Sequence, residues 1–147
     1  MTFIARTVVA LLALFGASTI AAAQDAKHKV PIQVSMNDPA GMNLALNNAQ
    51  NVINYYKAKK ETVDVQIVTY GPGLHMLRGD TSPVKQRVAT MSLENPNLHF
   101  LACQNTRDNM TKAEGKEFPI ISEAKLVPSG VITLMELQEK GYSYIRP

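Results

Sequence analysis

The sequence of 147 residues contains one cysteine and no tryptophan. A single cysteine excludes an intramolecular disulfide framework and a metal site built from cysteines alone. The chain also lacks a large excess of positive or negative residues, because 15 Lys and Arg residues and 12 Asp and Glu residues give a formal net charge of only +3. This charge is too small and too dispersed for a nucleic-acid-binding surface. Hydrophobic residues make up 46% of the chain, so we expect one globular domain rather than a disordered chain.

The longest apolar run lies near the start of the chain. Arg6 precedes residues 7–20, TVVALLALFGASTI, and three alanines ending at Ala23 come before the polar Gln24. This order is typical of a secretory signal peptide. Retention as a membrane anchor is the alternative, but the run is shorter than the about 20 apolar residues that span a bilayer. The sequence predicts a signal peptide at 1–23, cleaved after Ala23, and one domain at 24–147 in the periplasm or outside the cell, free of the membrane.

The rest of the chain alternates between strand and helix patterns. We expect strands at 30–35, 63–70, 98–103 and 124–127, with 142–145 as either a last short strand or a tail laid across the domain. Helices are expected from 39 to about 60, from 82 onward, at 106–115 and from 130 to about 140, the last with Val131, Leu134, Met135 and Leu137 facing inward. Asp38 and Pro39 are typical of a helix start. Alternating strands and helices with short connections predict a three-layer α/β/α sandwich around a mainly parallel, five-stranded sheet.

Ligands of such sheets bind beyond the carboxyl ends of the strands. The residues that this rule places at one edge of the sheet, and that we predict as candidate site residues, are Asn37, Gly71, Gly73, His75, Cys103, Asn105 and Ser129.

Cys103 is the most distinctive of these residues. It lies between a predicted strand and the first turn of a predicted helix, where unpaired N–H groups and the helix dipole lower the pKa of a thiol below its free value of about 8.5. The resulting thiolate is the nucleophile for persulfide transfer or thiol exchange. The alternative is that Cys103 is a small buried hydrophobic residue, as free cysteines often are.

The other candidates allow two interpretations each. His75 is either a base or anion contact, or a solvated loop histidine. Gly71 and Gly73 either bring backbone N–H groups to an anion or form a turn that needs a permissive backbone. Arg78 and Asp80, in the loop that follows, either bind a partner or make a solvated turn, and we expect the turn.

The histidines do not make a metal site with the cysteine. His99 precedes Cys103 by four residues on one strand, which separates the two by about 13 Å, whereas metal–ligand bonds are about 2.0–2.3 Å long. A pair of Cys103 and His75 would bind a metal weakly. We therefore predict no metal and no cofactor.

Three stretches carry a family resemblance: residues 51–77 (NVINYYKAKKETVDVQIVTYGPGLHML), 101–115 (LACQNTRDNMTKAEG) and 126–147 (LVPSGVITLMELQEKGYSYIRP). Together they resemble the secreted, single-domain members of the DsrE/DsrF-like family. The resemblance implies a five-stranded parallel sheet and a homo-oligomer, often a trimer or hexamer. It also implies that Cys103 matches the cysteine that carries a persulfide in the sulfur-relay members.

These observations lead to two main hypotheses. In the first, the protein handles sulfur or thiols through Cys103, with His75 or Asn105 orienting the ligand and a second protein as sulfur donor or acceptor. In the second, it is a non-catalytic ligand-binding or assembly module in which Cys103 is structural. A third hypothesis, metal handling through Cys103 and His75, has the least support from the sequence.

Overall fold

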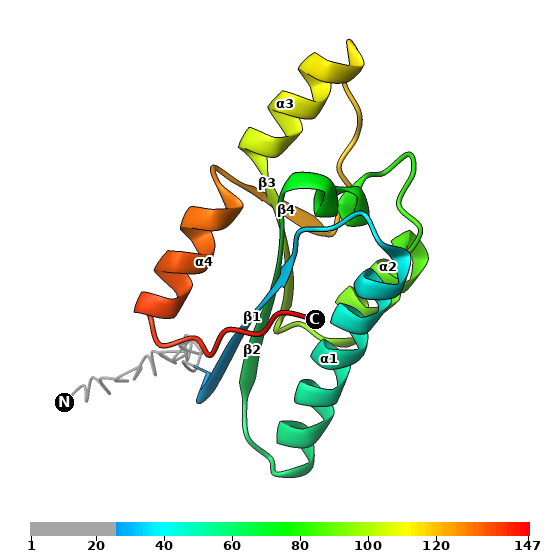
Figure 1. Ribbon diagram of the computed structural model, residues 1–147. Helices are drawn as coiled ribbons and strands as arrows, with labels where there is room; N and C mark the ends of the chain where they lie inside the picture. Colours follow the sequence, from blue (N-terminus) through cyan, green and yellow to red (C-terminus); the bar gives the residue numbers. More distant parts are fainter. Residues whose placement is uncertain (1–25) are drawn as a thin grey trace, which may run out of the picture.

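The computed structural model describes residues 26–147 and shows a parallel sheet with helices on both faces (Figure 1). The predicted signal peptide at 1–23 lies outside the described residues. The sheet has the order β1-β2-β3-β4, formed by β1 (His28–Val34), β2 (Val63–Thr69), β3 (Leu98–Cys103) and β4 (Ala124–Val127). The helices are α1 (Pro39–Ala58), α2 (Lys85–Glu94), α3 (Gln104–Glu114) and α4 (Gly130–Glu139), with a 3-10 helix, η1 (Gly71–Leu77), before α2.

The helices cover the two faces of the sheet unequally. Helices α1 and α2 lie on one face, α4 lies on the other, and α3 extends beyond the carboxyl ends of the strands (Figure 1). The larger core lies between the sheet and α1, where Ile67, Met42 and Leu46 are fully buried. The core under α4 is small and consists of Val68, Leu101, Leu134 and Leu137. Because side chains alternate along a strand, β2 contributes Ile67 to one core and Val68 to the other.

The start of α1 agrees with its sequence signal. The carboxylate of Asp38 accepts hydrogen bonds from the N–H groups of Ala40 (3.1 Å) and Gly41 (2.9 Å), and Pro39 occupies the first helical position. These bonds satisfy N–H groups that have no partner within the helix. Asp38 and Pro39 therefore set the position at which α1 begins after β1.

The predicted fifth strand is wrong, and the sheet has four strands. Residues 142–147 instead lie as a tail along β1, where Gln33 N–H donates to Ile145 O and Ile145 N–H donates to Pro31 O, both at 3.0 Å. The single bridge in this segment joins Ile32 and Ile145. For this ladder of hydrogen bonds to continue, the backbone N–H of residue 31 would have to donate to the carbonyl oxygen of Ser143, and Pro31 has no N–H group. The alternative that the sequence left open, a tail laid across the domain, is the one observed.

Two further differences concern helices. Helix α2 begins at Lys85 rather than at residue 82, and the predicted turn at 71–73 opens the 3-10 helix η1. On α4, Leu134 and Leu137 face inward as predicted, but Val131 and Met135 do not, with 47% and 52% of their surface exposed. Within residues 26–147 no helix has both the length and the hydropathy needed to cross a membrane.

Candidate functional site

Cys103 ends β3 and is itself the N-cap of α3. Its Sγ accepts a hydrogen bond from the backbone N–H of Thr106 at 3.4 Å. This helix, expected from the sequence at 106–115, begins earlier, at Gln104, because the thiol of Cys103 takes the role of an N-cap oxygen. Cys103 is only 3% exposed, so the sulfur is covered by the elements that surround it.

A hydrogen bond from the start of η1 orients the hydroxyl of Thr106 near the thiol. The N–H of Gly71, at the start of η1, donates to Thr106 Oγ1 at 3.0 Å. A hydroxyl oxygen that accepts one hydrogen bond still has its own hydrogen to donate. Thr106 can donate that hydrogen to Cys103 Sγ. Gly71, 32 positions before the cysteine, thus orients the Thr106 hydroxyl as a donor to the thiol.

More donors surround the same sulfur. Burial of the side chain, which is the largest single influence, raises the pKa of the Cys103 thiol. The Thr106 side chain and the backbone N–H groups of Gly130, Thr106 and Asn105 act in the opposite direction and together hold this pKa below its ordinary value. Hydrogen bonds to the charged form are the cause, because they stabilise the thiolate over the thiol. The donors belong to the first turns of two helices, α3 and α4, whose dipoles also favour a negative charge.

Gly130 reaches the thiol because it has no side chain. A Cβ at this position would lie 2.9 Å from Cβ of Tyr70, closer than real contacts allow. Tyr70, which follows β2, therefore packs directly against the start of α4. The sequence pointed to the neighbouring Ser129, which is the N-cap of α4 but makes no side-chain capping bond; its backbone oxygen accepts from Thr133 N–H at 2.9 Å.

The two glycines of η1 have different structural roles. Gly71 has a φ of +52°, a left-handed conformation that favours glycine. A Cβ on Gly73 would lie 2.2 Å from the carbonyl oxygen of Val34, so η1 packs directly on the backbone at the end of β1. Gly71 supports the thiol site through Thr106, whereas Gly73 serves the packing of η1.

The remaining candidates lie apart from these donors. His75 lies in η1, and its Nε2 is hydrogen-bonded at 2.9 Å to Oγ1 of Thr81, which lies in the loop after η1. Asn37 is exposed before α1, and the side chain of Asn105 is on the surface while its N–H faces the thiol. The structure thus brings together Cys103, Gly71 and Asn105 from the predicted set. It adds Thr106, one helical turn after the cysteine, and Gly130, which follows the predicted Ser129 at the end of β4.

Arg78 is not in a solvated turn, as the sequence analysis expected. Arg78 is only 3% exposed, and its guanidinium carbon lies 3.8 Å from the centre of the Phe118 ring. It forms paired hydrogen bonds with the carboxylates of Asp80 and Glu114. These bonds hold the pKa of Asp80 at about 2 and tie the end of α3 to the loop after η1.

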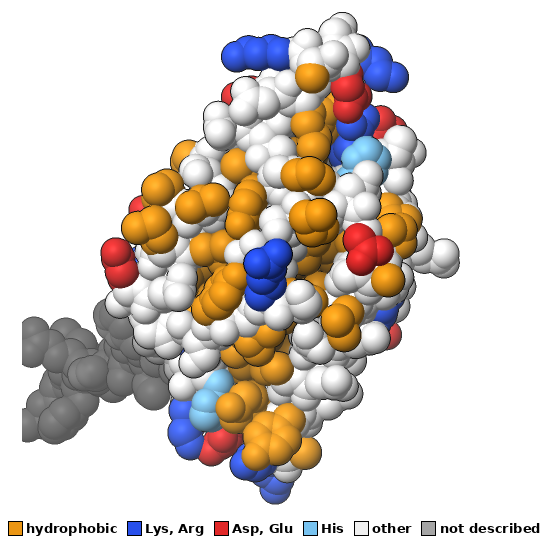
Figure 2. Space-filling model, in the orientation of Figure 1, with side chains coloured by type: hydrophobic (Ala, Val, Ile, Leu, Met, Phe, Trp, Pro, Cys, Tyr) orange, Lys and Arg blue, Asp and Glu red, His pale blue; other side chains and the backbone are white. Residues whose placement is uncertain are grey.

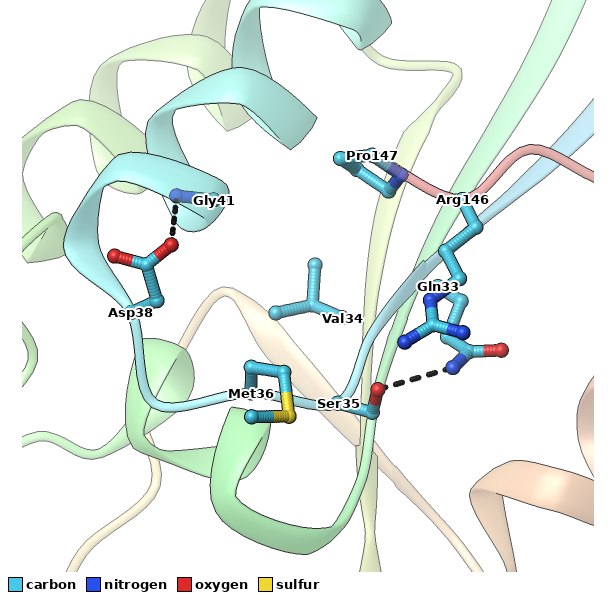
Figure 3. A pocket seen from close by; sticks show the side chains of 8 residues that line it. All are labelled: Gln33, Val34, Ser35, Met36, Asp38, Gly41, Arg146 and Pro147. Carbon is cyan, nitrogen blue, oxygen red and sulfur yellow. Dashed lines mark hydrogen bonds between the residues drawn. The ribbon is translucent and has the colours of Figure 1, made fainter.

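A small cavity of about 100 Å³ lies at the carboxyl end of β1 (Figure 3). Its polar groups largely satisfy one another: Asp38 accepts from Gly41 N–H, and Gln33 donates to Ser35 Oγ at 3.0 Å. Ligand pockets for small molecules are usually about 300–1,000 Å³, and this cavity shares no residue with the thiol site. Among the described residues, no group of three or more His, Cys, Asp or Glu side chains could hold a metal ion.

Comparison with known proteins adds a structural relative. No family model and no curated protein matches the chain. A solved structure, of the protein of unknown function MTH1491 from Methanobacterium thermoautotrophicum, is similar with a TM-score of 0.68 and 27% sequence identity. The match covers 82% of this chain and 99% of that chain. The two proteins share an α/β fold with a parallel sheet. Because the function of the relative is unknown, the likeness carries no activity to this chain.

Proposed function

We propose that this chain is an exported sulfur- or thiol-handling protein in which the thiolate of Cys103 carries sulfane sulfur as a persulfide. One observation carries the proposal: donors from the first turns of α3 and α4 converge on Cys103 Sγ and lower the pKa of its thiol. The thiolate is the species that attacks sulfur, and a lowered pKa raises its share at a given pH.

The transfer is balanced without an external oxidant. The Cys103 thiolate attacks the sulfane sulfur of a persulfide or thiosulfate, a new S–S bond forms, and the S–S bond of the donor breaks. The electron pair of that bond leaves with the donor thiolate or sulfite. In the second half, an acceptor thiolate attacks the outer sulfur of the Cys103 persulfide, and Cys103 leaves as a thiolate. The donors around Sγ stabilise this leaving group in the same way as the nucleophile.

The resemblance to the DsrE/DsrF-like family supports the sulfur chemistry, because Cys103 is at the position that carries the persulfide in its relay members. The signal-peptide pattern at 1–23 supports a place in the periplasm or outside the cell. The partners would then be a sulfur-donor and a sulfur-acceptor protein of the same compartment.

One observation favours a second function. Cys103 is 3% exposed, as expected of a structural cysteine in a binding or assembly module. In that case the hydrogen bonds to Sγ would serve only to join α3 and α4 to the sheet.

The alkylation rate of Cys103 across pH tests the proposal, with Cys103→Ser as the blank. We expect the folded protein to be labelled without unfolding, more slowly than a free thiol because Cys103 is 3% exposed, and with a midpoint below that of a free thiol. Thr106→Val removes the oriented hydroxyl and should move the midpoint upward, whereas Thr106→Ser keeps the hydroxyl and should leave it nearly unchanged. Incubation with thiosulfate or glutathione persulfide should add the mass of one sulfur atom to the wild type but not to Cys103→Ser.

Labelling only after unfolding would overturn the proposal and favour the structural role of Cys103. Equal midpoints for the wild type and Thr106→Val would show that the hydroxyl does not stabilise the thiolate.

A further inference from the structure

The side chain of Arg87 on α2 reaches across to α1. Its Nη1 donates to Asn43 Oδ1 at 2.7 Å and to the carbonyl oxygen of Asn43 at 3.3 Å, and its Nη2 donates to Asn47 Oδ1 at 2.5 Å. Asn43 is itself fixed, because its Nδ2 donates to the carbonyl oxygen of Pro39 at 2.9 Å. The guanidinium is therefore held in position by two residues that are neighbours on one side of α1.

The charge of Arg87 has no carboxylate partner among the described residues. All the oxygens that accept from it belong to amide groups, which are neutral. Arg78, by contrast, is paired with the carboxylates of Asp80 and Glu114. Arg87 is half-buried, and taking a charge out of water costs free energy unless an opposite charge compensates. An anion from outside the chain would therefore stabilise this arrangement.

Arg87 also keeps hydrogen-bond donors for such an anion. A guanidinium has five N–H groups. The three bonds to α1 leave at least two of them without a partner in residues 26–147, and Nε–H is one of these. Two neighbouring N–H groups of a guanidinium match the two oxygens of a carboxylate.

A groove of about 570 Å³ between α1 and α2 has Arg87 in its wall. Pockets for small molecules usually have about 300–1,000 Å³. None of the described residues that line the groove is acidic, and Arg87 is the one basic residue among them. Val84 and Met91, which are 4% and 5% exposed, form an apolar part of its floor, and the amides of Gln50 and Gln86 add polar groups.

The surroundings of the groove do not repel an anion. Helix α1 has no acidic residue, and its one charged residue is Lys57, in the last turn. Figure 2 shows the surface over the middle of α1 in white and orange, the colours of uncharged side chains and backbone. The one acidic residue of α2 is Glu94 at its end, about two helical turns after Arg87.

We propose that this groove binds a small organic monocarboxylate. Arg87 binds the carboxylate through its remaining N–H groups, and the apolar body of the ligand lies on Val84 and Met91. One guanidinium matches one negative charge, whereas a phosphate dianion is matched better by two cations. The groove shares no residue with the thiol site, so the proposal does not depend on the sulfur chemistry of Cys103.

Sodium benzoate is the probe for this site. The purified protein is titrated with benzoate in place of sodium chloride, so that the ionic strength and the screening of surface charges stay constant. We expect saturable shifts of the backbone amide signals of α1 and α2 around Arg87 in nuclear magnetic resonance spectra. Acetate, which has almost no apolar body, should bind more weakly than benzoate because it buries less apolar surface. Inorganic phosphate should also bind more weakly.

Asn47→Asp is the sharpest variant. It turns a neutral acceptor into a carboxylate in place and gives Arg87 the kind of counter-ion that Arg78 already has. We expect it to weaken benzoate binding by about tenfold or more while α1 and α2 stay joined. Arg87→Gln should weaken binding by a similar factor. Asn109→Asp makes the same change of charge at an exposed position on α3 and should leave the affinity nearly unchanged, and circular dichroism verifies that all variants fold.

Several outcomes would overturn the proposal. An absence of saturable shifts, or shifts that map away from the groove, would show that no carboxylate site exists there. Equal affinities of the wild type and Asn47→Asp would show that Arg87 only joins α2 to α1. Phosphate that binds more tightly than benzoate, or acetate that binds as tightly, would overturn the assignment to a monocarboxylate with an apolar body. None of these measurements uses the thiol, so this site and the proposed function can fail separately.

Discussion

The close approach of η1 to β1 predicts that Gly73→Ala is far more damaging than alanine at other glycines. A Cβ on Gly73 would lie 2.2 Å from Val34 O, 2.6 Å from Val34 C and 2.7 Å from Ser35 N. All three atoms belong to the backbone, so no side-chain rotation relieves the overlap. Val34 O also accepts the N–H of Tyr70 at 3.2 Å, and a shift of β1 away from η1 would stretch this bond.

The expected cost follows from these distances. Ordinary van der Waals contact begins near 3.4 Å, so the nearest pair must separate by 3.4 − 2.2 = 1.2 Å. Adding atoms to a packed interior costs about 1–3 kcal/mol when neighbouring side chains can move. Because here the backbone must move and a hydrogen bond is strained, we expect Gly73→Ala to lower the free energy of unfolding by about 3–5 kcal/mol.

Two other glycines serve as controls. Gly71 and Gly115 have φ of +52° and +67°, but a Cβ on Gly71 meets its nearest atom at 3.8 Å and one on Gly115 meets nothing within 4 Å. Alanine at either position costs the left-handed strain of about 1–2 kcal/mol, partly offset by the reduced freedom of the unfolded chain.

Urea unfolding monitored by circular dichroism measures all three variants. A Gly73→Ala variant that is as stable as Gly71→Ala would refute the close packing of η1 on β1. It would also reopen the interpretation that the glycines bring N–H groups to an anion.

Three further predictions concern stability. Arg78→Leu should cost about 1–3 kcal/mol in the same unfolding assay, less than the loss of a fully buried ion pair, because Asp80 and Glu114 are about one third exposed and can rehydrate. The pKa of Asp80 is lowered to about 2, so its pairing with Arg78 stabilises the fold fully above the ordinary carboxyl pKa near 4, and this stabilisation is lost as the pH falls toward 2. If the wild type and the Arg78→Leu variant lose stability equally on acidification, this prediction is wrong. Asp38→Ala should cost about 1 kcal/mol by removing the acceptor for two N–H groups of α1, while Asp38→Asn, which can still cap, should cost much less.

Much of the chain path could be read from local sequence. The β-branched runs predict β1 and β2, the segment Leu98–Cys103 is β3 as predicted, and Asp38 with Pro39 marks the start of α1. These signals act between residues a few positions apart, through alternation, capping and the fixed φ of proline. The position of Cys103 between β3 and α3 follows from the same signals.

The candidate site could be predicted only in part. Placing Cys103 at a helix start needs no tertiary information, but its donors come from segments far along the chain. Gly71 orients Thr106 from the start of η1, and Gly130 approaches because Tyr70 packs against it. No local pattern states which N–H groups will face a given sulfur. The burial of Arg78 is of the same kind, since it depends on Glu114 and Phe118.

The sequence by itself determined the order of strands and helices and the place of the one cysteine within it, because both depend on short-range backbone preferences. Only the tertiary structure decided how many strands the sheet has and which apolar residues are covered. Pro31 limits the pairing of the tail with β1 only because the two segments meet. The periodicity of α4 marks its apolar residues, but Val131 and Met135 are exposed because one chain supplies a covering surface on one side of that helix alone. Burial depends on the packing of distant segments, and this is the information that a local pattern does not contain.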